Sequence, residues 1–117
     1  MQYIFLLYAQ ETGYGTLSEA EKAAWWAKIN GYNDALVKKG HFKFTSGLQS
    51  PKTAKKLSKR NGKLTTVDGP FAETKEQLLG FYLIEAKDEA EALALAGDAP
   101  MAEFGTIEVR ALNTRGG

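Results

Sequence analysis

Cysteine is absent from the 117 residues of the chain, and histidine occurs once. Without cysteine there is no disulfide framework and no thiolate site, which favours the cytoplasm over a secreted location. One histidine, without a spaced cluster of carboxylates, does not provide the ligand set of a metal site. No glycine-rich turn followed by Lys-Ser or Lys-Thr is present to hold a phosphate. We therefore expect neither a metal nor a cofactor.

A strong charge of either sign and a long apolar run are also missing. The chain has 15 Lys and Arg against 14 Asp and Glu, so its net charge of +1 gives no general attraction to nucleic acid or to an anionic membrane. The apolar run near the amino terminus covers only Tyr3 to Tyr8, which is typical of a strand rather than a signal peptide or membrane span. With 44% hydrophobic and 25% charged residues, the composition predicts one globular domain over residues 1–117.

Two segments predict strands that are apolar on both faces. In Gln2 to Tyr8, the aromatic and aliphatic side chains alternate without a polar face. In Leu79 to Ala86, Phe81 and Leu83 lie on one face, and Tyr82 and Ile84 on the other. Both strands should therefore be covered on two sides.

Two helices are predicted from their first residues and their periodicity. Ser18 with Glu21 forms a capping-box pattern, and apolar residues then recur with a helical period up to Lys39, followed by Gly40. Asp88 is the expected N-cap of a shorter, alanine-rich helix that ends near Gly97.

A hairpin is expected between the two helices. One strand covers His41 to Ser50, and two short strands, Thr53 to Lys59 and Lys63 to Val67, are joined by Arg60-Asn61-Gly62. Asn-Gly is a strong hairpin signal. The last strand, Thr106 to Leu112, alternates between apolar and charged residues.

This order of elements predicts an α+β fold of the ferredoxin-like β-α-β-β-α-β type, with an inserted β-hairpin and both helices on one face of the sheet. The other face would then expose large apolar side chains, which soluble monomers rarely do. We expect a second copy to cover it, sheet to sheet, in a homodimer. The alternative is that the inserted hairpin folds over that face.

The hairpin carries a run of positive charge from Lys52 to Lys63 without an acid. Such a run can contact the phosphates of nucleic acid, but no aromatic residue is interleaved for base stacking. A solvated hairpin whose charges discourage edge pairing is the favoured interpretation. We expect no nucleic-acid partner.

The segment from Val67 to Glu76, followed by Gly80-Phe81-Tyr82, resembles the YCII-related family in its Asp-Gly-Pro-Phe branch. The resemblance covers nearly the whole chain and implies a dimeric α+β barrel. Some relatives resemble small enzymes that act on aromatic or lactone compounds by proton transfer. The branch is often associated with extracytoplasmic-function sigma factor systems, and a paired histidine and aspartate is the proposed site in the parent group.

Asp68 and Glu73 are the candidate catalytic residues, as a pair of carboxylates for general acid and base chemistry next to the rigid Gly69-Pro70 turn. Asp68 can instead stabilise that turn by accepting backbone hydrogen bonds, and Glu73 can be a surface charge. Phe71 and Tyr82 are candidates to line an apolar ligand pocket, although aromatic residues on strands are more often core.

His41 is the remaining candidate base. It follows the long helix at a position that does not match the histidine of the parent group, so we expect it to face solvent.

These features favour a homodimer that binds a small aromatic or anionic molecule in a cleft between the long helix and the sheet, near Asp68, Phe71 and Glu73, with cofactor-free proton transfer if it is catalytic. The alternative is a non-catalytic interaction or regulatory module in which Asp68-Gly69-Pro70-Phe71 is a structural bend.

Overall fold

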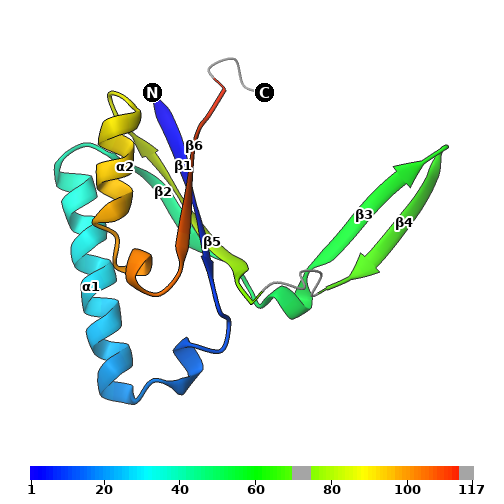
Figure 1. Ribbon diagram of the computed structural model, residues 1–117, viewed down its shortest axis with the longest axis horizontal. Helices are drawn as coiled ribbons and strands as arrows, with labels where there is room; N and C mark the ends of the chain where they lie inside the picture. Colours follow the sequence, from blue (N-terminus) through cyan, green and yellow to red (C-terminus); the bar gives the residue numbers. More distant parts are fainter. Residues whose placement is uncertain (70–74, 114–117) are drawn as a thin grey trace.

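The computed structural model of the chain describes residues 1–69 and 75–113. An antiparallel sheet in the order β2-β5-β1-β6 forms its centre, from β1 (Gln2–Ala9), β2 (Phe42–Gly47), β5 (Gln77–Glu85) and β6 (Thr106–Ala111). The helices α1 (Glu19–Lys38) and α2 (Glu89–Gly97) lie on one side of this sheet (Figure 1). A separate two-stranded sheet consists of β3 (Lys55–Arg60) and β4 (Lys63–Asp68), and short 3-10 turns are η1 (Tyr14–Thr16), η2 (Pro51–Thr53) and η3 (Pro100–Glu103).

The topology confirms the predicted α+β, ferredoxin-like fold with an inserted hairpin. β1 pairs antiparallel with both β5 and β6, and β5 also pairs with β2. The two β-α-β units are therefore interleaved in one sheet, and their crossover helices α1 and α2 share one face.

The predicted capping box at the start of α1 is confirmed. The backbone N–H of Glu21 donates to Ser18 Oγ at 3.1 Å, and the backbone N–H of Ser18 donates to Glu21 Oε1 at 2.8 Å. The helix ends before Gly40, whose φ of +79° is in the left-handed region that favours glycine. Ile29 and Leu36 from the predicted apolar stripe are buried.

The core lies between the helices and one face of the sheet. Tyr3 and Phe5 of β1 and Tyr82 and Ile84 of β5 point toward the helices and are each at most 4% exposed. Alternate residues on a strand share a face, so these four side chains form one layer. The helices contribute the buried residues Leu36, Ala92 and Ala96 to the same cluster.

The opposite face of the sheet, here called the open face, carries apolar side chains that are only partly buried. Its apolar residues are Ile4, Leu6, Phe44, Phe81 and Leu83. Those of β1 and β5 alternate along the strand with core residues, and Phe44 of β2 is opposite Leu83. Phe44 is 52% exposed, and its ring lies 5.9 Å from that of Phe81 between centroids. The prediction that β1 and β5 are apolar on both faces is therefore confirmed.

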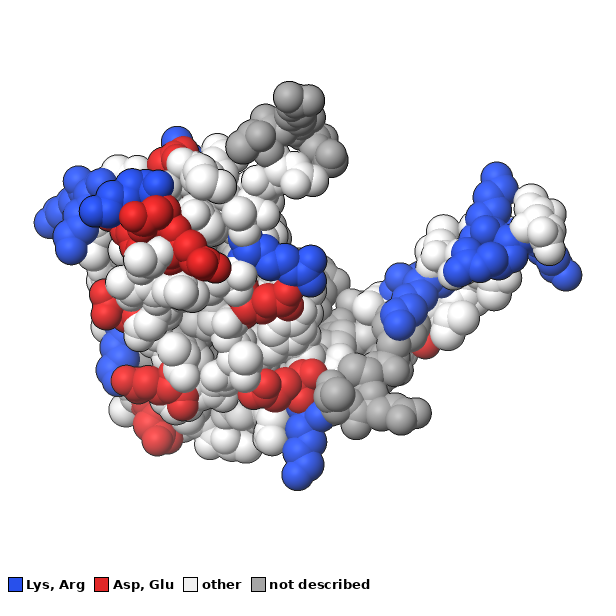
Figure 2. All heavy atoms as spheres, turned by 45° about the horizontal axis from the view of Figure 1, so that its top comes forward, with Lys and Arg blue, Asp and Glu red and all other residues white. Residues whose placement is uncertain are grey.

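The inserted hairpin, here called the arm, comprises β3, β4 and the turn between them, residues 55–68. Asn61 and Gly62 connect the strands with φ values of 52° and 76°, as a two-residue hairpin turn requires. In Figure 1 the arm projects to the side of the sheet opposite the helices, and Figure 2 shows open space between the arm and the rest of the molecule.

The alternative in which the hairpin folds over the open face is therefore wrong for the chain as described. At the base of the arm, the backbone N–H of Gly69 donates to the carbonyl of Ala54 at 2.7 Å, which extends the pairing of β3 with β4, and η2 precedes β3 directly. The two strands leave this base side by side and away from the sheet.

Several strand boundaries differ from the sequence prediction by one to three residues. β3 begins at Lys55 rather than Thr53, because Ser50 caps η2 and the Thr53 hydroxyl donates to the Ser50 carbonyl at 2.7 Å. β5 begins at Gln77 rather than Leu79, and a register shift next to Tyr8 accommodates the additional residue. Bulges of this kind re-aim side chains, and here one lies at the end of the sheet nearest the arm.

Candidate functional site

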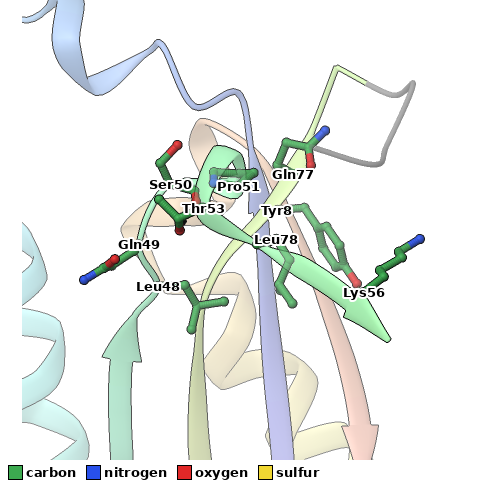
Figure 3. A pocket seen from close by; sticks show the side chains of 10 residues that line it. Tyr8, Leu48, Gln49, Ser50, Pro51, Thr53, Lys56, Gln77 and Leu78 are labelled. Atoms are coloured by element: carbon green, nitrogen blue, oxygen red, sulfur yellow. Dashed lines mark hydrogen bonds between the residues drawn. The ribbon is translucent and has the colours of Figure 1, made fainter. Parts of the chain in front are cut away.

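A cavity of about 710 Å³ lies at the base of the arm, between the arm and the end of the sheet (Figure 3). Its walls come from four separate parts of the chain: the end of β1, the turn containing η2, the start of β3 and the start of β5. The lining residues are Tyr8, Leu48, Gln49, Ser50, Pro51, Thr53, Ala54, Lys56, Gln77 and Leu78.

The turn from Leu48 to Ala54 forms one wall and is held by local hydrogen bonds. Leu48 N–H donates to the carbonyl of Leu79 at 2.8 Å, which ties the start of the turn to β5. Ser50 Oγ accepts from Lys52 N–H at 3.2 Å. Proline at the first position of η2 has a fixed φ that suits a helical turn. The wall is therefore defined by its own sequence.

The lining combines apolar surface with a few polar groups. Leu48, Pro51 and Leu78 supply apolar contacts. The polar groups include the phenol hydroxyl of Tyr8 and the ammonium group of Lys56, whose side chains lie on the same side of the cavity in Figure 3. Small-molecule sites typically have this size and this mixture of apolar walls and few polar groups.

The side chains of Tyr8, Glu108 and Arg110 form a hydrogen-bonded chain on the open face, across β1 and β6. The Tyr8 hydroxyl donates to Glu108 Oε1 at 3.3 Å, and the Nε of Arg110 donates to the other carboxylate oxygen of Glu108. Burial and then the negative charge of Glu108 raise the pKa of Tyr8 above its ordinary value of 10. The hydrogen bond from Arg110 lowers the pKa of Glu108. At neutral pH, a neutral phenol therefore faces an ionised carboxylate.

The structure places the predicted catalytic residue Asp68 at the end of β4, in an ion pair. Lys55 Nζ lies 2.9 Å from Asp68 Oδ1, and the Asp68 side chain is 77% exposed. Asp68 and Lys55 are directly opposite in the hairpin, whereas Lys56 is opposite Val67. Neighbouring residues on a strand point to opposite faces, so the Asp68 carboxylate points away from the face on which Lys56 lines the cavity.

The predicted residues Glu73 and Phe71 lie outside the described residues. Their expected roles in catalysis and in ligand binding stay predictions.

Tyr82 lies in the core rather than in the cavity at the base of the arm. It is 2% exposed, its hydroxyl donates to Asn33 Oδ1 at 2.5 Å, and its ring meets that of Tyr32 edge to face at 5.7 Å. Burial raises the pKa of Tyr82. Between α1 and the sheet, where a cleft was expected, Tyr32, Leu36 and Tyr82 form part of the packed core. A ligand contact by Tyr82 stays a prediction.

His41 lies between α1 and β2, and its ring is partly buried. Its Nδ1 is 2.8 Å from the carbonyl oxygen of Glu85, so the ring has a backbone partner rather than facing only solvent as expected. Asp68 lies in the arm, remote from this segment (Figure 1).

Four residues of this region, Tyr8, Lys56, Glu108 and Arg110, were not predicted as site residues from the sequence. A signal for part of this set existed, because the alternation of Thr106 to Leu112 placed Glu108 and Arg110 on one face. Their contact with Tyr8 depends on the pairing of β1 with β6, in which Tyr8 is opposite Thr106 and Leu6 is opposite Glu108. No local pattern specifies that register.

Within residues 1–69 and 75–113, no group of three or more His, Cys, Asp and Glu side chains is arranged to hold a metal ion. The helices in that part of the chain are also too short or too polar to span a membrane.

Comparison with known proteins gives a family, a relative and a solved structure. The sequence profile of the YCII-related domain matches residues 1–114. An uncharacterised protein of Rhizobium meliloti (strain 1021) is 36% identical over 114 residues, which cover 96% of this chain and 92% of the relative.

The solved structure is 5-chloro-2-hydroxyhydroquinone dehydrochlorinase (TftG) from Burkholderia phenoliruptrix AC1100, in complex with 2,5-dihydroxybenzoquinone. It aligns over 97% of this chain and 94% of its own with a TM-score of 0.56 at 13% identity. At this identity, the similarity supports the fold.

Proposed function

Since the chain belongs to the YCII-related domain family, we propose that it is a cytoplasmic homodimer that binds a small aromatic or anionic molecule. The single observation that carries this proposal is the cavity of about 710 Å³ at the base of the arm, with its apolar walls and the polar groups of Tyr8 and Lys56. Within the family, we place the chain in the Asp-Gly-Pro-Phe branch, a proposal supported by the segment Asp68-Gly69-Pro70-Phe71.

The chemistry of the lining selects the class of ligand. Apolar side chains such as Leu48 and Leu78 favour a flat, apolar ring. The ammonium group of Lys56 favours an anionic or strongly electronegative substituent, because charge-assisted hydrogen bonds are the stronger kind. The structural neighbour TftG holds 2,5-dihydroxybenzoquinone, a small ring with several oxygen substituents, which makes this compound a suitable first probe.

The open face supports the homodimer. Its apolar residues include Phe44 and Phe81, which are partly exposed. A soluble monomer rarely exposes a large apolar patch. A two-fold axis would place the same patch of a second copy against it.

If the protein is an enzyme, we propose that Asp68 and Glu73 transfer the proton and that Phe71 and Tyr82 contact the ligand. Asp68 is exposed and lies at the base of the arm near the cavity, with its carboxylate on the face opposite to Lys56. If it transfers a proton, Asp68→Asn abolishes turnover of a bound compound and leaves its affinity nearly unchanged.

A non-catalytic interaction or regulatory module, associated with an extracytoplasmic-function sigma factor system, is the second candidate. The observation that favours it is the ion pair between Lys55 and Asp68, which joins the two strands at the base of the arm. In that case Asp68→Asn changes neither affinity nor any reaction.

Isothermal titration calorimetry with 2,5-dihydroxybenzoquinone and a panel of hydroxybenzoates tests the proposal. Replacing the lining lysine, Lys56→Met, should weaken binding by about 10- to 100-fold, the loss expected for a hydrogen bond to a charged group. Lys63→Met, on the same face of the arm but near its tip, is the matched control and should bind like the wild type. Absence of binding by the whole panel, or equal losses in both variants, would contradict the proposed site.

A further inference from the structure

The hydroxyl of Tyr8 is a polar group of the cavity whose hydrogen-bonding direction depends on two residues beside it. Tyr8 lines the cavity, and Glu108 and Arg110 lie next to it on β6. The Tyr8 hydroxyl donates to Glu108 Oε1 at 3.3 Å, and Arg110 Nε donates to Glu108 Oε2. The three side chains therefore form a chain of donors and acceptors that begins at the cavity wall.

The pairing of β1 with β6 places these three side chains on the open face. Tyr8 is opposite Thr106, and Glu108 follows Thr106 by two residues, so it is a diagonal neighbour of Tyr8 on the same face. Arg110 follows Glu108 by two more residues. The side chain of Glu108 is 35% exposed and that of Arg110 is 69% exposed. The register of the strands therefore holds the partly buried carboxylate next to the phenol.

The chemistry of the three groups decides which of them donates. A guanidinium group can only donate, and an ionised carboxylate can only accept. Because the hydrogen bond from Arg110 lowers the pKa of Glu108, the carboxylate is ionised at neutral pH. Burial and then the charge of Glu108 raise the pKa of Tyr8, so the phenol keeps its proton and donates it to Glu108. Toward the cavity, the Tyr8 oxygen is left as a hydrogen-bond acceptor.

The second polar group, the ammonium group of Lys56, has the opposite requirement. Lys56 lies on the same side of the cavity as Tyr8 (Figure 3). An ammonium group can only donate, and it favours an anionic acceptor. A carboxylate or a phenolate of the ligand meets the requirement of Lys56. A neutral hydroxyl group of the ligand meets the requirement of Tyr8.

We infer that Tyr8, positioned by Glu108 and Arg110, selects aromatic anions that also carry a neutral ring hydroxyl. This inference rests on the proposed ligand site and narrows the class of its ligands. A methyl ether of the same compound would place an ether oxygen, which can only accept, opposite the accepting oxygen of Tyr8. Such ethers should therefore bind more weakly than the corresponding phenols. Glu108 and Arg110 are positioning residues, because they act through Tyr8.

The substitution Glu108→Gln should reverse this selection. Glutamine has a similar size, but its amide has an oxygen that accepts and an NH2 group that donates. Arg110 donates, so it holds the amide oxygen and leaves the NH2 group facing Tyr8. The Tyr8 oxygen then accepts from the amide, and its proton turns toward the cavity, where it suits an acceptor on the ligand. A residue that only supported the sheet would not reverse a preference between two ligands.

Isothermal titration calorimetry with pairs of hydroxybenzoates and the corresponding methoxybenzoates measures the selection as the affinity ratio of each pair. Tyr8→Phe gives the steric baseline, because it removes the hydroxyl and leaves the ring. We expect the wild-type ratio to exceed this baseline by about 3- to 10-fold for at least one pair, the effect of one hydrogen bond. The Glu108→Gln ratio for that pair should lie below the baseline. Glu89→Gln, which removes an exposed carboxylate on α2, is the control and should keep the wild-type ratio.

The outcomes separate this inference from the ligand site on which it rests. A wild-type ratio equal to the baseline for every pair, or a Glu108→Gln ratio at or above the baseline, overturns the selection by Tyr8. If Lys56→Met still weakens binding in that case, the ligand site stands without this selection. Absence of binding by every compound overturns both the ligand site and the inference.

Discussion

Tyr8 is the residue at which the sheet, the cavity and the charged edge strand meet. Its hydroxyl lines the cavity and donates to Glu108. Burial raises the pKa of Tyr8 most, and the Glu108 charge adds to it. We predict that Glu108→Gln lowers the pKa of Tyr8 but leaves it above 10, because the burial remains. Titration of the tyrosine ring carbons by NMR measures the shift.

The control for this prediction is Tyr8→Phe, which identifies the signal of Tyr8 by its disappearance. An unchanged Tyr8 pKa in Glu108→Gln would show that the hydrogen bond of 3.3 Å does not persist in solution.

A substitution at Tyr82 distinguishes a structural role in the core from a role in ligand binding. Because the Tyr82 hydroxyl donates to Asn33 of α1, Tyr82→Phe removes one partly buried hydrogen bond and should lower the free energy of unfolding by about 0.5–1.5 kcal/mol. Denaturant melts measure this loss. A ligand affinity that falls while stability is unchanged would instead support the predicted role in binding.

Individual site residues were the least predictable part of this chain. Asp68 stood out because Asp-Gly-Pro is an unusual turn sequence, yet the structure pairs its carboxylate with Lys55. The sequence gives no signal of a site at Tyr8 or Lys56, because Tyr8 is part of an apolar run and Lys56 is part of a basic run. They become neighbours of one cavity only through the bulge in β5 and the path of η2.

Among the elements, α1 depends on its first turn. Ser18→Ala removes the side-chain acceptor of the capping box and should cost about 1 kcal/mol at neutral pH. A chemical-denaturation series of both proteins between about pH 3 and pH 7 checks it.

The pH dependence of this cap has a defined sign. Hydrogen bonds from Ser18 lower the pKa of Glu21 in the folded protein. The stabilisation of the folded protein by ionised Glu21 is therefore fully present above the unfolded pKa of about 4.3. It is lost as the pH falls through the lower pKa of the folded protein. The wild type should therefore lose stability relative to Glu21→Gln as the pH falls, and a difference between these two proteins that does not change with pH would contradict the capping box.

The elements themselves were predictable because their signals are local. The caps at Ser18 and Asp88, the Asn61-Gly62 turn and the alternation in β1 and β5 were each recognised and are present. The errors lie at the ends of strands, for example where η2 precedes β3. The direction in which the arm leaves the sheet has no signal in the side-chain pattern of the sequence.

At the scale of the whole molecule, the open face and the core make different contributions. Leu83 lies on the open face, while its neighbours Tyr82 and Ile84 are buried. If the open face is the proposed dimer interface, Leu83→Lys gives a monomer that remains folded, because the substitution places a charge on that face without creating a cavity in the core. Sedimentation velocity together with a thermal melt measures both properties.

The matched control is Val37→Lys, at a position on α1 that is 58% exposed. It should remain a dimer. A Leu83→Lys protein that stays dimeric would exclude the open face as the interface.

The arm stands apart from the body, so its surface is free from the packing constraints that bind the core residues to one another. Substitutions there can therefore change the charge and the apolar surface that the molecule presents without changing how the chain folds. What the arm contacts can thus diverge between relatives more readily than the core can. Exchanging residues 55–68 between two relatives should leave both folds intact, which thermal melts of the exchanged proteins would test.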